Sequence, residues 1–425
     1  MLGREKEAAA APSKRDWPLY LLLLYLAFEY LRPMDLLWLR SLGTLRPGLI
    51  LSSLVAVAWV FSSRKGRSFS STAKWLFTYL LLLTAYVPLA VNNRDAFHAA
   101  KDVFLVTVCF LGMTAWIDSP VKLHRTHMWI ARLTICLAVR GILKFRGIAG
   151  DFDRFSHFLG DENDFCLLMV VLLPFVYLPL FGQYSKRAKL LCLVASLLCL
   201  ISIAVSDSRG GFLGLVLVGF YCWVKSPRKI PSLILVFFLS LILLKAGGAE
   251  YRKEIASIGT AAEKGDTGRI RLISWNAGWM VFRDHPLGVG GNNYRYSVDP
   301  YIGYFTAELN RSLSGRQAHS IYFTALPELG IFGLVVLPGL FISVIRRYRR
   351  TAKTLASIDT PEANRMRIFS LAGLGGLLGY LSAGAFVSVL YYPHAYYLAA
   401  FAVVVGRLTD EAVAARSHEE KSVSS

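Results

Sequence analysis

Long apolar runs separated by short polar connections make up most of the chain. A helix needs about 20 apolar residues to cross a hydrocarbon core of about 30 Å, somewhat more or fewer if it tilts. Barrel strands are shorter and alternate in polarity, so these runs favour helices. The pattern therefore predicts an all-α polytopic membrane protein with about 12 transmembrane helices, at approximately residues 18–31, 44–61, 75–91, 103–118, 128–145, 165–182, 188–205, 210–224, 231–245, 319–345, 368–389 and 393–408.

The composition excludes a soluble protein and a disordered one. The chain of 425 residues is 55% hydrophobic and only 18% charged, whereas soluble globular proteins average about 45–50% apolar and about 25% charged residues. The cysteines all lie in apolar runs, with no C-x-x-C pair and no regular loop spacing. They are expected to be small buried residues rather than disulfides or metal ligands; these are Cys109, Cys136, Cys166, Cys192, Cys199 and Cys222.

The net charge of +19 has several interpretations by itself, because nucleic acid, anionic lipid and acidic substrates all attract basic proteins. Membrane topology is a further explanation, and the positive-inside rule tests it, since alternate connections between spans should differ in their Lys and Arg content. With the N-terminus in the cytoplasm, the cytoplasmic segments hold 26 basic residues and the short connections on the other face hold 9. Topology thus explains much of the charge, and both termini are expected in the cytoplasm.

The same topology divides the chain into five segments. Residues 1–17 form a cytoplasmic tail that leads into the first run without a cleavage site, so this run is expected to remain as an anchor. Residues 18–245 hold nine spans, residues 319–408 hold the last three, and residues 409–425 form a second cytoplasmic tail. Residues 246–318 make one long outer loop, which is expected to form a small subdomain with short helices.

A helical pattern in this loop predicts a helix that lies at the membrane interface. Aromatic side chains beside an apolar stripe are typical of such helices. Here Trp275 and Trp279 stand beside an apolar face formed by Ile273, Ala277, Met280 and Val281.

Arginines on the outer side are the first candidates for a binding site. Arg209 lies in a very short connection between two spans, so it is expected at or just within the interface. An ionisable residue at this depth is a candidate functional residue. Arg269 and Arg271 open the loop helix, and Arg271 lies one turn before Trp275 on the same side. A guanidinium beside an indole suits a lipid phosphate or diphosphate. The alternatives are an arginine that snorkels to lipid headgroups and an ordinary basic amphipathic helix.

His319 stands where the outer loop meets the next span, near Arg311 and Arg316. Its near-neutral pKa suits a general base, and a structural histidine is the alternative. No metal is expected, because the single D-x-D triplet Asp151-Phe152-Asp153 is no more than chance predicts. The neighbouring acidic residues would have to complete any cation site; they are Asp161, Glu162 and Asp164. Nucleotide, dinucleotide and nucleic-acid motifs are lacking, so neither a cofactor nor nucleic acid is expected.

Three blocks in order, all placed on one face, resemble the O-antigen ligase/polymerase family. A weaker fourth block, Arg154-Phe155 with Gly160 and Asn163, is similar to the family's pattern before its middle spans. The three blocks are Ser208-Arg209-Gly210-Gly211; Arg271-x-x-x-Trp275 followed by Asp284-His285-Pro286-Leu287-Gly288-Val289-Gly290; and Ala318-His319-Ser320-Ile321-Tyr322 leading to Glu328-Leu329-Gly330-Ile331-Phe332-Gly333-Leu334.

The resemblance implies a metal-independent, inverting glycosyltransferase of lipopolysaccharide biosynthesis, in a bacterial inner membrane with its active site facing the periplasm. It would move a glycan from undecaprenyl diphosphate to a hydroxyl on lipid A–core. By analogy Arg209 and Arg271 would hold the donor diphosphate, and His319 would accept the proton of the acceptor. Arg269 and Arg295 would add phosphate contacts. Candidate substrate contacts are Arg154, Asn163, Arg311, Arg316 and Trp275.

The acceptor stays open, and so does one alternative of another class. Ala318-His319-Ser320 and the early Phe28-Glu29-Tyr30-Leu31-Arg32-Pro33 resemble a subgroup of O-glycosylation ligases linked to exosortase systems. A polysaccharide polymerase and a protein O-oligosaccharyltransferase are therefore rivals. A solute or lipid transporter would also have twelve spans, and Arg132 and Arg140 within the fifth span favour it. The single outer loop and the lack of repeated halves argue against a transporter.

Overall fold

A computed structural model describes residues 16–62, 70–148, 150, 159–231, 233, 267–302 and 315–424. This described part is helical and contains no β-strand. Its principal helices are α1 (Trp17–Leu31), the 3-10 helix η3 (Leu37–Leu45), α2 (Pro47–Val60), α3 (Ser71–Tyr86), α4 (Asn93–Trp116), α5 (Pro120–Phe145), α6 (Glu162–Tyr177), α7 (Lys186–Val205), α8 (Arg209–Lys225), α11 (Thr267–Asp284), α12 (Tyr294–Ser297), α14 (Ile321–Thr354), α15 (Pro361–Ala383) and α16 (His394–Ser424).

The all-α membrane architecture is confirmed, and the count of about 12 spans is not. Each predicted run falls on a described helix except 231–245, nearly all of which lies outside the described residues. By length and composition, six described helices could cross a membrane, or seven if the bent pair Trp38–Leu45 and Pro47–Val60 is one span. Helices α1 and α8, with 15 and 17 residues, are shorter than a full span.

Polar residues at the ends of the apolar runs begin most of these helices. The side chain of each N-cap residue accepts a hydrogen bond from a backbone N–H two or three residues further on, which satisfies a donor that the helix itself leaves open. This holds at Ser70, Asn92, Ser119, Asp161, Ser185, Ser208, Ser320 and Thr360.

Helices α6, α8 and α15 pack closely because α15 carries small residues. A Cβ at Gly375 would lie 2.7 Å from the ring of Tyr221 in α8, and one at Gly379 would lie 3.0 Å from Val170 in α6. The small-x-x-x-small pattern of α15, Gly375 to Gly379, is thus a packing surface. This packing places the first residues of α6 and α8 side by side at one end of the bundle.

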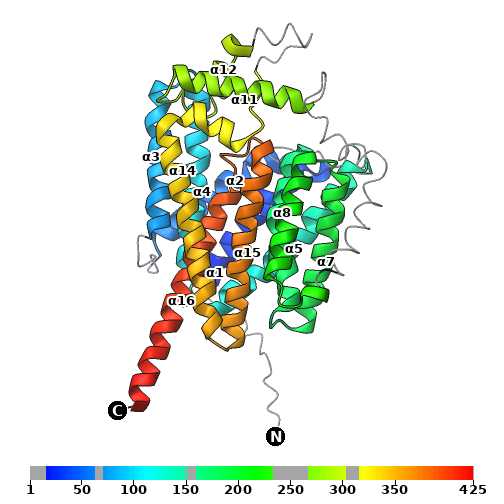
Figure 1. Cartoon of the computed structure of the whole chain (residues 1–425), viewed down its shortest axis with the longest axis vertical. Helices are drawn as coiled ribbons and strands as arrows, with labels where there is room; N and C mark the ends of the chain where they lie inside the picture. Colours follow the sequence, from blue (N-terminus) through cyan, green and yellow to red (C-terminus); the bar gives the residue numbers. More distant parts are fainter. Residues whose placement is uncertain are drawn as a thin grey trace.

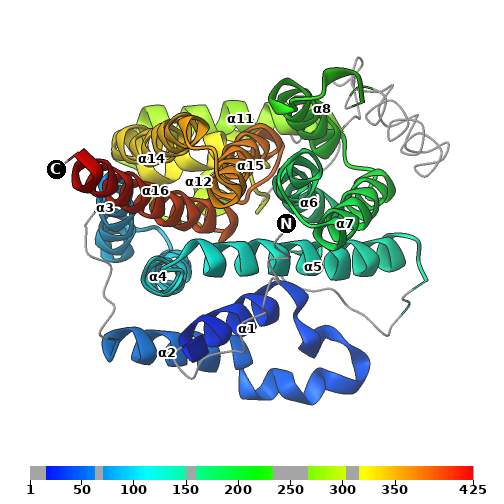
Figure 2. The same cartoon turned by 90° about the horizontal axis from the view of Figure 1, so that it is seen from below.

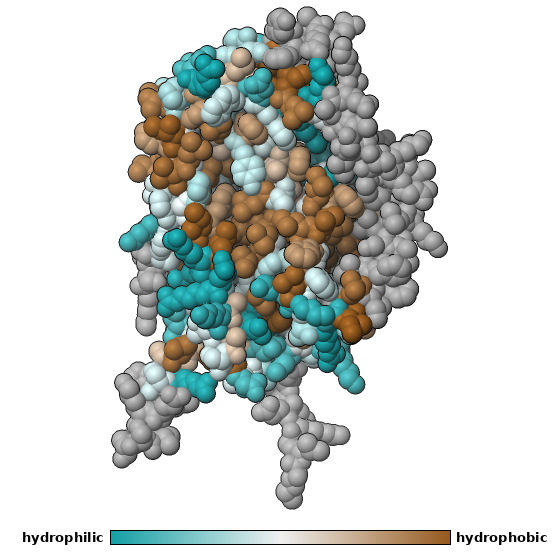
Figure 3. All heavy atoms as spheres, in the orientation of Figure 1, coloured by the Kyte–Doolittle hydropathy of each residue, from teal (hydrophilic) through white to brown (hydrophobic). Residues whose placement is uncertain are grey.

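The loop helix α11 lies across that end of the bundle (Figure 1), and the C-terminal part of α16 extends from the opposite end. Seen from below, α1 and α2 lie on one side of α4 and α5 (Figure 2). Hydrophobic side chains dominate the middle of the described face, and hydrophilic ones lie toward the upper end and, more densely, toward the lower end (Figure 3). The long helices therefore run between two polar ends, as membrane-spanning helices must.

The apolar face of α11 is buried, but against protein. Ile273, Ala277 and Val281 pack on Val289 and on α12 in a small second core. Three residues of the predicted stripe are thus buried, whereas Met280 is only partly buried and lies outside this core. Trp279 is 48% exposed, as expected of an interfacial residue, whereas Trp275 stacks on another aromatic ring of the protein.

Candidate active site

His319 lines a polar cleft of about 420 Å³ near the end of the bundle that α11 covers. Residues far apart in the sequence meet there: the end of α1, the middle of α4, the start of α6 and the segment that precedes α16. Apart from His319, the groups able to bind or transfer protons are mainly carboxylates and phenols, namely Glu29, Asp102, Asp161, Asp164, Tyr391 and Tyr392.

The main chain around His319 is held on both sides. The indole Nε1 of Trp275 donates to the carbonyl of Ala318 at 2.9 Å, and Ser320 caps α14 by accepting from the backbone N–H of Phe323. Between them His319 has φ 48°, the left-handed region that non-glycine residues seldom adopt. Such strain persists only where the surroundings impose it, and it is frequent at active sites.

The His319 imidazole is poised to accept a proton. Burial lowers its pKa below the ordinary histidine value, and the nearby positive charges of Arg271 and Arg316 lower it further. The carboxylate of Asp161 acts in the opposite direction. A histidine with a lowered pKa is neutral at neutral pH, which is the form that a general base requires.

Arg271 and Trp275 act from the same side of α11, as their spacing predicts. The Trp275 ring stacks on Phe323 of α14, with ring centroids 5.1 Å apart and planes 6° apart. Arg271 lies one turn earlier and close enough to influence the charge of His319. Arg269 lies two residues before Arg271 and therefore on another face of the helix. Of the two arginines, Arg271 is the one that the structure brings to the histidine.

Arg209 begins α8 beside the start of α6. The Ser208 hydroxyl donates to Oδ1 of Asn163 at 2.7 Å and accepts from the backbone N–H of Gly211. A Cβ at Gly211 would lie 2.0 Å from Sγ of Cys166, so only glycine fits this close approach. Two blocks that the sequence placed about 45 residues apart, around Asn163 and around Arg209, are therefore in direct contact.

A line of packed aromatic rings connects Arg209 with the histidine segment. Gly210 packs on Phe386, whose Cβ would lie 2.8 Å from a Cβ at that glycine. The Phe386 ring lies 6.2 Å from Trp275, which bonds to Ala318. The beginnings of α6, α8 and α14 and the first turns of α11 thus form one contiguous region.

The remaining predicted arginines are placed differently. Arg295, on α12, pairs with Asp95 of α4 and lies over the Tyr296 ring, 4.9 Å from its centroid. The hydrogen bond to Asp95 raises the pKa of Arg295, and the side chain does not line the cleft. Arg316 lies beside His319. Arg154, Arg311 and the triplet 151–153 lie outside the described residues.

The blocks 284–290 and 328–334 support the cleft through their backbones. The N–H of Gly290 donates to the carbonyl of Glu328 at 3.0 Å, and the N–H of Ile331 donates to the carbonyl of Pro286 at 2.9 Å. At Gly330, where α14 is kinked, φ is 57° and ψ is −150°. A Cβ there would lie 2.4 Å from the backbone of Leu287. These glycines therefore permit the outer turn to dock on α14.

The Glu328 carboxylate ties the same turn to the cleft wall. It is fully buried and accepts from the backbone N–H groups of Asn292 at 3.0 Å and of Tyr294 at 2.9 Å. The hydroxyl of Tyr391, in the segment before α16, also donates to it. Three separate segments are thereby fixed around one acid.

Sequence reasoning missed two of the four carboxylates that line the cleft, Glu29 and Asp102. Glu29 and Asp102 each stand within an apolar helix, and an ionisable residue in such a position is itself a signal of function. The Tyr392 hydroxyl donates to Asp164 at 3.0 Å, a contact across 228 positions that no local pattern contains. Among the described residues, no group of three or more His, Cys, Asp and Glu is arranged to hold a metal ion.

Fold and cleft define a multi-pass helical membrane protein whose polar site faces one end of the bundle, beside a helix that lies across it. Residues 194–337 match the family model described as O-antigen ligase. The chain is therefore similar to the O-antigen ligase family over this region, which includes all three principal blocks. The family implies an enzyme of the ligase or polymerase type. No curated protein matches the chain.

Proposed function

We propose that this protein is an O-antigen ligase-type glycosyltransferase. It transfers a glycan from undecaprenyl diphosphate to a hydroxyl of lipid A–core at the periplasmic face of a bacterial inner membrane. The observation that carries the proposal is His319 in the polar cleft beside Asp161, with its pKa lowered by burial and by the charges of Arg271 and Arg316. The O-antigen ligase match over residues 194–337 supports it.

In the proposed reaction the imidazole of His319 takes the proton of the acceptor hydroxyl. The acceptor oxygen then attacks the anomeric carbon in line, the bond from that carbon to the phosphate oxygen breaks, and the diphosphate leaves with the bonding electrons. A single displacement of this kind inverts the anomeric centre. Arg271 and Arg209 offset the charge that develops on the diphosphate, which is the largest electrostatic demand of the step.

Cations and carboxylates near His319 have different roles in this proposal. Arg271 and Arg316, whose charges act on His319, would bind phosphate. Carboxylates cannot bind a diphosphate without a cation, but they accept hydrogen bonds from sugar hydroxyls, so Asp164 and Asp102 suit the glycan or the acceptor. Asp161 has a further role, because its charge stabilises the imidazolium that His319 becomes after it takes the proton.

The direct test is transfer by purified protein in liposomes that contain undecaprenyl-diphosphate-linked glycan and one acceptor at a time. The acceptors are lipid A–core, a second lipid-linked repeat and a peptide. Transfer to lipid A–core is expected. Transfer only to the repeat would make the protein a polysaccharide polymerase, and transfer only to the peptide would make it a protein O-oligosaccharyltransferase.

Matched variants separate chemistry from folding. His319→Ala and Arg271→Gln are each expected to abolish transfer while expression stays normal. The controls are His98→Ala, because His98 does not line the cleft, and Arg283→Gln, because Arg283 is exposed at the far end of the same helix α11 and is not among the charges that act on His319. Equal loss of activity in the variants and in their controls would contradict the assigned roles.

A further inference from the structure

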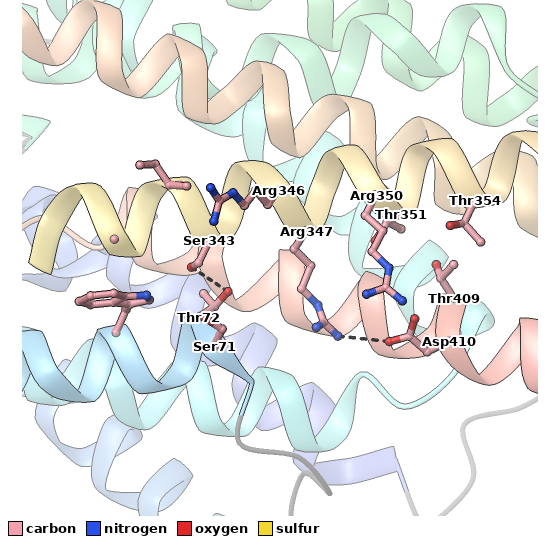
Figure 4. A pocket seen from close by; sticks show the side chains of 14 residues that line it. Ser71, Thr72, Ser343, Arg346, Arg347, Arg350, Thr351, Thr354, Thr409 and Asp410 are labelled. Carbon is pink, nitrogen blue, oxygen red and sulfur yellow. Dashed lines mark hydrogen bonds and ion pairs between the residues drawn. The ribbon is translucent and has the colours of Figure 1, made fainter. Parts of the chain in front are cut away.

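A second cavity, of about 370 Å³, lies at the opposite end of α14, between α3, α14 and α16 (Figure 4). At about 1.5 Å per residue, α14 rises about 36 Å beyond its kink at Gly330, from that residue to Thr354 in the cavity lining. This exceeds a hydrocarbon core of about 30 Å. If the cleft of His319 lies at one membrane surface, this second cavity lies at the other.

The cavity is apolar at one end and strongly basic at the other. Trp75 of α3 lies directly on α14, since a Cβ at Gly339 would be 2.6 Å from its ring, and Ile342 adds to the same wall. One helical turn further on, the wall consists of three arginines, Arg346, Arg347 and Arg350.

The arginines outnumber the acids on the walls. Asp410 of α16 is the acidic residue that the described lining contains. Its side chain is 61% exposed and its Oδ2 lies 3.7 Å from Nη2 of Arg347, a separation at the limit of an ion pair. The Nε of Arg347 is buried and has no hydrogen-bond partner among the described residues. A buried donor without a partner is costly unless a ligand supplies the acceptor.

The surrounding helices are shaped to accommodate Arg347. A Cβ at Gly406 of α16 would lie 2.2 Å from Nε of Arg347, so the glycine leaves the space in which the guanidinium lies. Figure 4 shows Arg347 and Arg350 turned toward Thr409 and Asp410 of α16. On the other side the Ser343 hydroxyl donates to Oγ1 of Thr72 at 3.0 Å, which joins α14 to α3. Basic residues at a membrane surface are common, but here they line a formed cavity.

We propose that this cavity binds an anionic glycerophospholipid. Its phosphate would lie among Arg346, Arg347 and Arg350, and its acyl chains would follow Trp75 and Ile342 toward the membrane interior. Arginine binds phosphate through paired hydrogen bonds, and basic pockets between transmembrane helices hold anionic headgroups. A free phosphate would share the charge complementarity but would leave the apolar wall unused, so the apolar wall favours a lipid. The proposal does not depend on the glycosyltransfer.

The test measures phosphatidylglycerol binding to the full-length protein in neutral detergent by native mass spectrometry. Phosphatidylglycerol is expected to bind and to remain bound when phosphatidylcholine or inorganic phosphate is added as a competitor. The double variant Arg347→Gln/Arg350→Gln should weaken binding about thirtyfold, the equivalent of ~2 kcal/mol for two surface arginines. Arg349→Gln, an exposed arginine of the same helix outside the cavity, should change affinity less than about twofold.

Gly406→Ala provides a second variant that removes no charge. Alanine favours a helix, while its Cβ would displace the Arg347 side chain, so phosphatidylglycerol should bind more weakly although the protein still folds. The proposal is overturned if Arg349→Gln weakens binding as much as the double variant does, since the effect would then be general surface charge. Displacement of the lipid by millimolar inorganic phosphate, or unchanged binding in Gly406→Ala, would also overturn it.

Discussion

Substitution of Gly330 by alanine should uncouple the outer turn from α14. The residue has φ 57° and ψ −150°, a combination that is essentially restricted to glycine, and forcing another residue into it costs about 1–3 kcal/mol. The new Cβ would also lie 2.4 Å from the carbonyl oxygen of Pro286 and from the backbone carbon of Leu287. Because these are backbone atoms, they cannot rotate away, and the turn must move.

Movement of the turn would break the hydrogen bonds that dock it. Three backbone bonds cross this contact: Val289 to Pro327, Gly290 to Glu328 and Ile331 to Pro286. Each contributes about 0.5–1.5 kcal/mol. With the backbone strain, the loss amounts to roughly 2.5–7.5 kcal/mol, which is a large part of the stability of an ordinary domain. Gly330→Ala should therefore unfold at a markedly lower temperature and should lose transfer activity.

Thermal unfolding of the solubilised protein, followed by intrinsic fluorescence, measures this loss. Gly219→Ala is the matched control, since a Cβ at Gly219 in α8 would meet no atom within 4 Å. Alanine replaces glycine in a helix interior there, and the control should be neutral or more stable by up to about 1 kcal/mol. A Gly330→Ala protein as stable and as active as the parent would refute the docking role of the turn.

Further predictions concern the cleft. Because burial and nearby cations lower the pKa of His319, kcat/KM should stay high down to a pH below the ordinary histidine value and fall as the pH drops through that lowered pKa. Asp161→Asn removes the anion that raises this pKa, so the acid limb should move to lower pH. Arg271→Gln removes a cation, so an NMR titration of the imidazole should show a higher pKa; shifts of the opposite sign would contradict the assigned electrostatics. Trp275→Phe keeps a ring against Phe323 but loses the bond to Ala318 at 2.9 Å, which should cost about 0.5–1.5 kcal/mol in thermal unfolding and lower kcat. EDTA should leave the rate unchanged, and a loss that added Mg²⁺ or Mn²⁺ restores would implicate Asp151 and Asp153.

The sequence was sufficient to locate the helices, because an apolar run in a membrane has no other stable backbone arrangement. The number of spans was not predictable in the same way. Segment 44–61 reads as one run, yet its first two residues end the 3-10 helix η3, which meets α2 at a bend of 49°. The run at 18–31 becomes a helix of only 15 residues. The hydropathy pattern predicts which segments of the chain are buried, but it does not predict where a helix bends.

Part of the site followed from local spacing and part did not. Arg271 and Trp275 are one turn apart on a helix, so their shared side was predictable. Arg295 meets Asp95 across 200 positions of sequence, and the resulting ion pair could not be foreseen. The carboxylates of the cleft likewise come from α1, α4 and α6, and only the packing of distant helices brings them to His319.

Helix α11 has two faces with different partners. One side carries Arg271 and Trp275 to the histidine segment, while Leu272 and Trp279 are about half exposed, at 49% and 48%, on the outside. These outer side chains suit the boundary layer of a bilayer. Because Arg271 of this helix influences the pKa of His319, we expect the turnover rate to respond to the curvature and packing of the surrounding membrane as well as to the substrates.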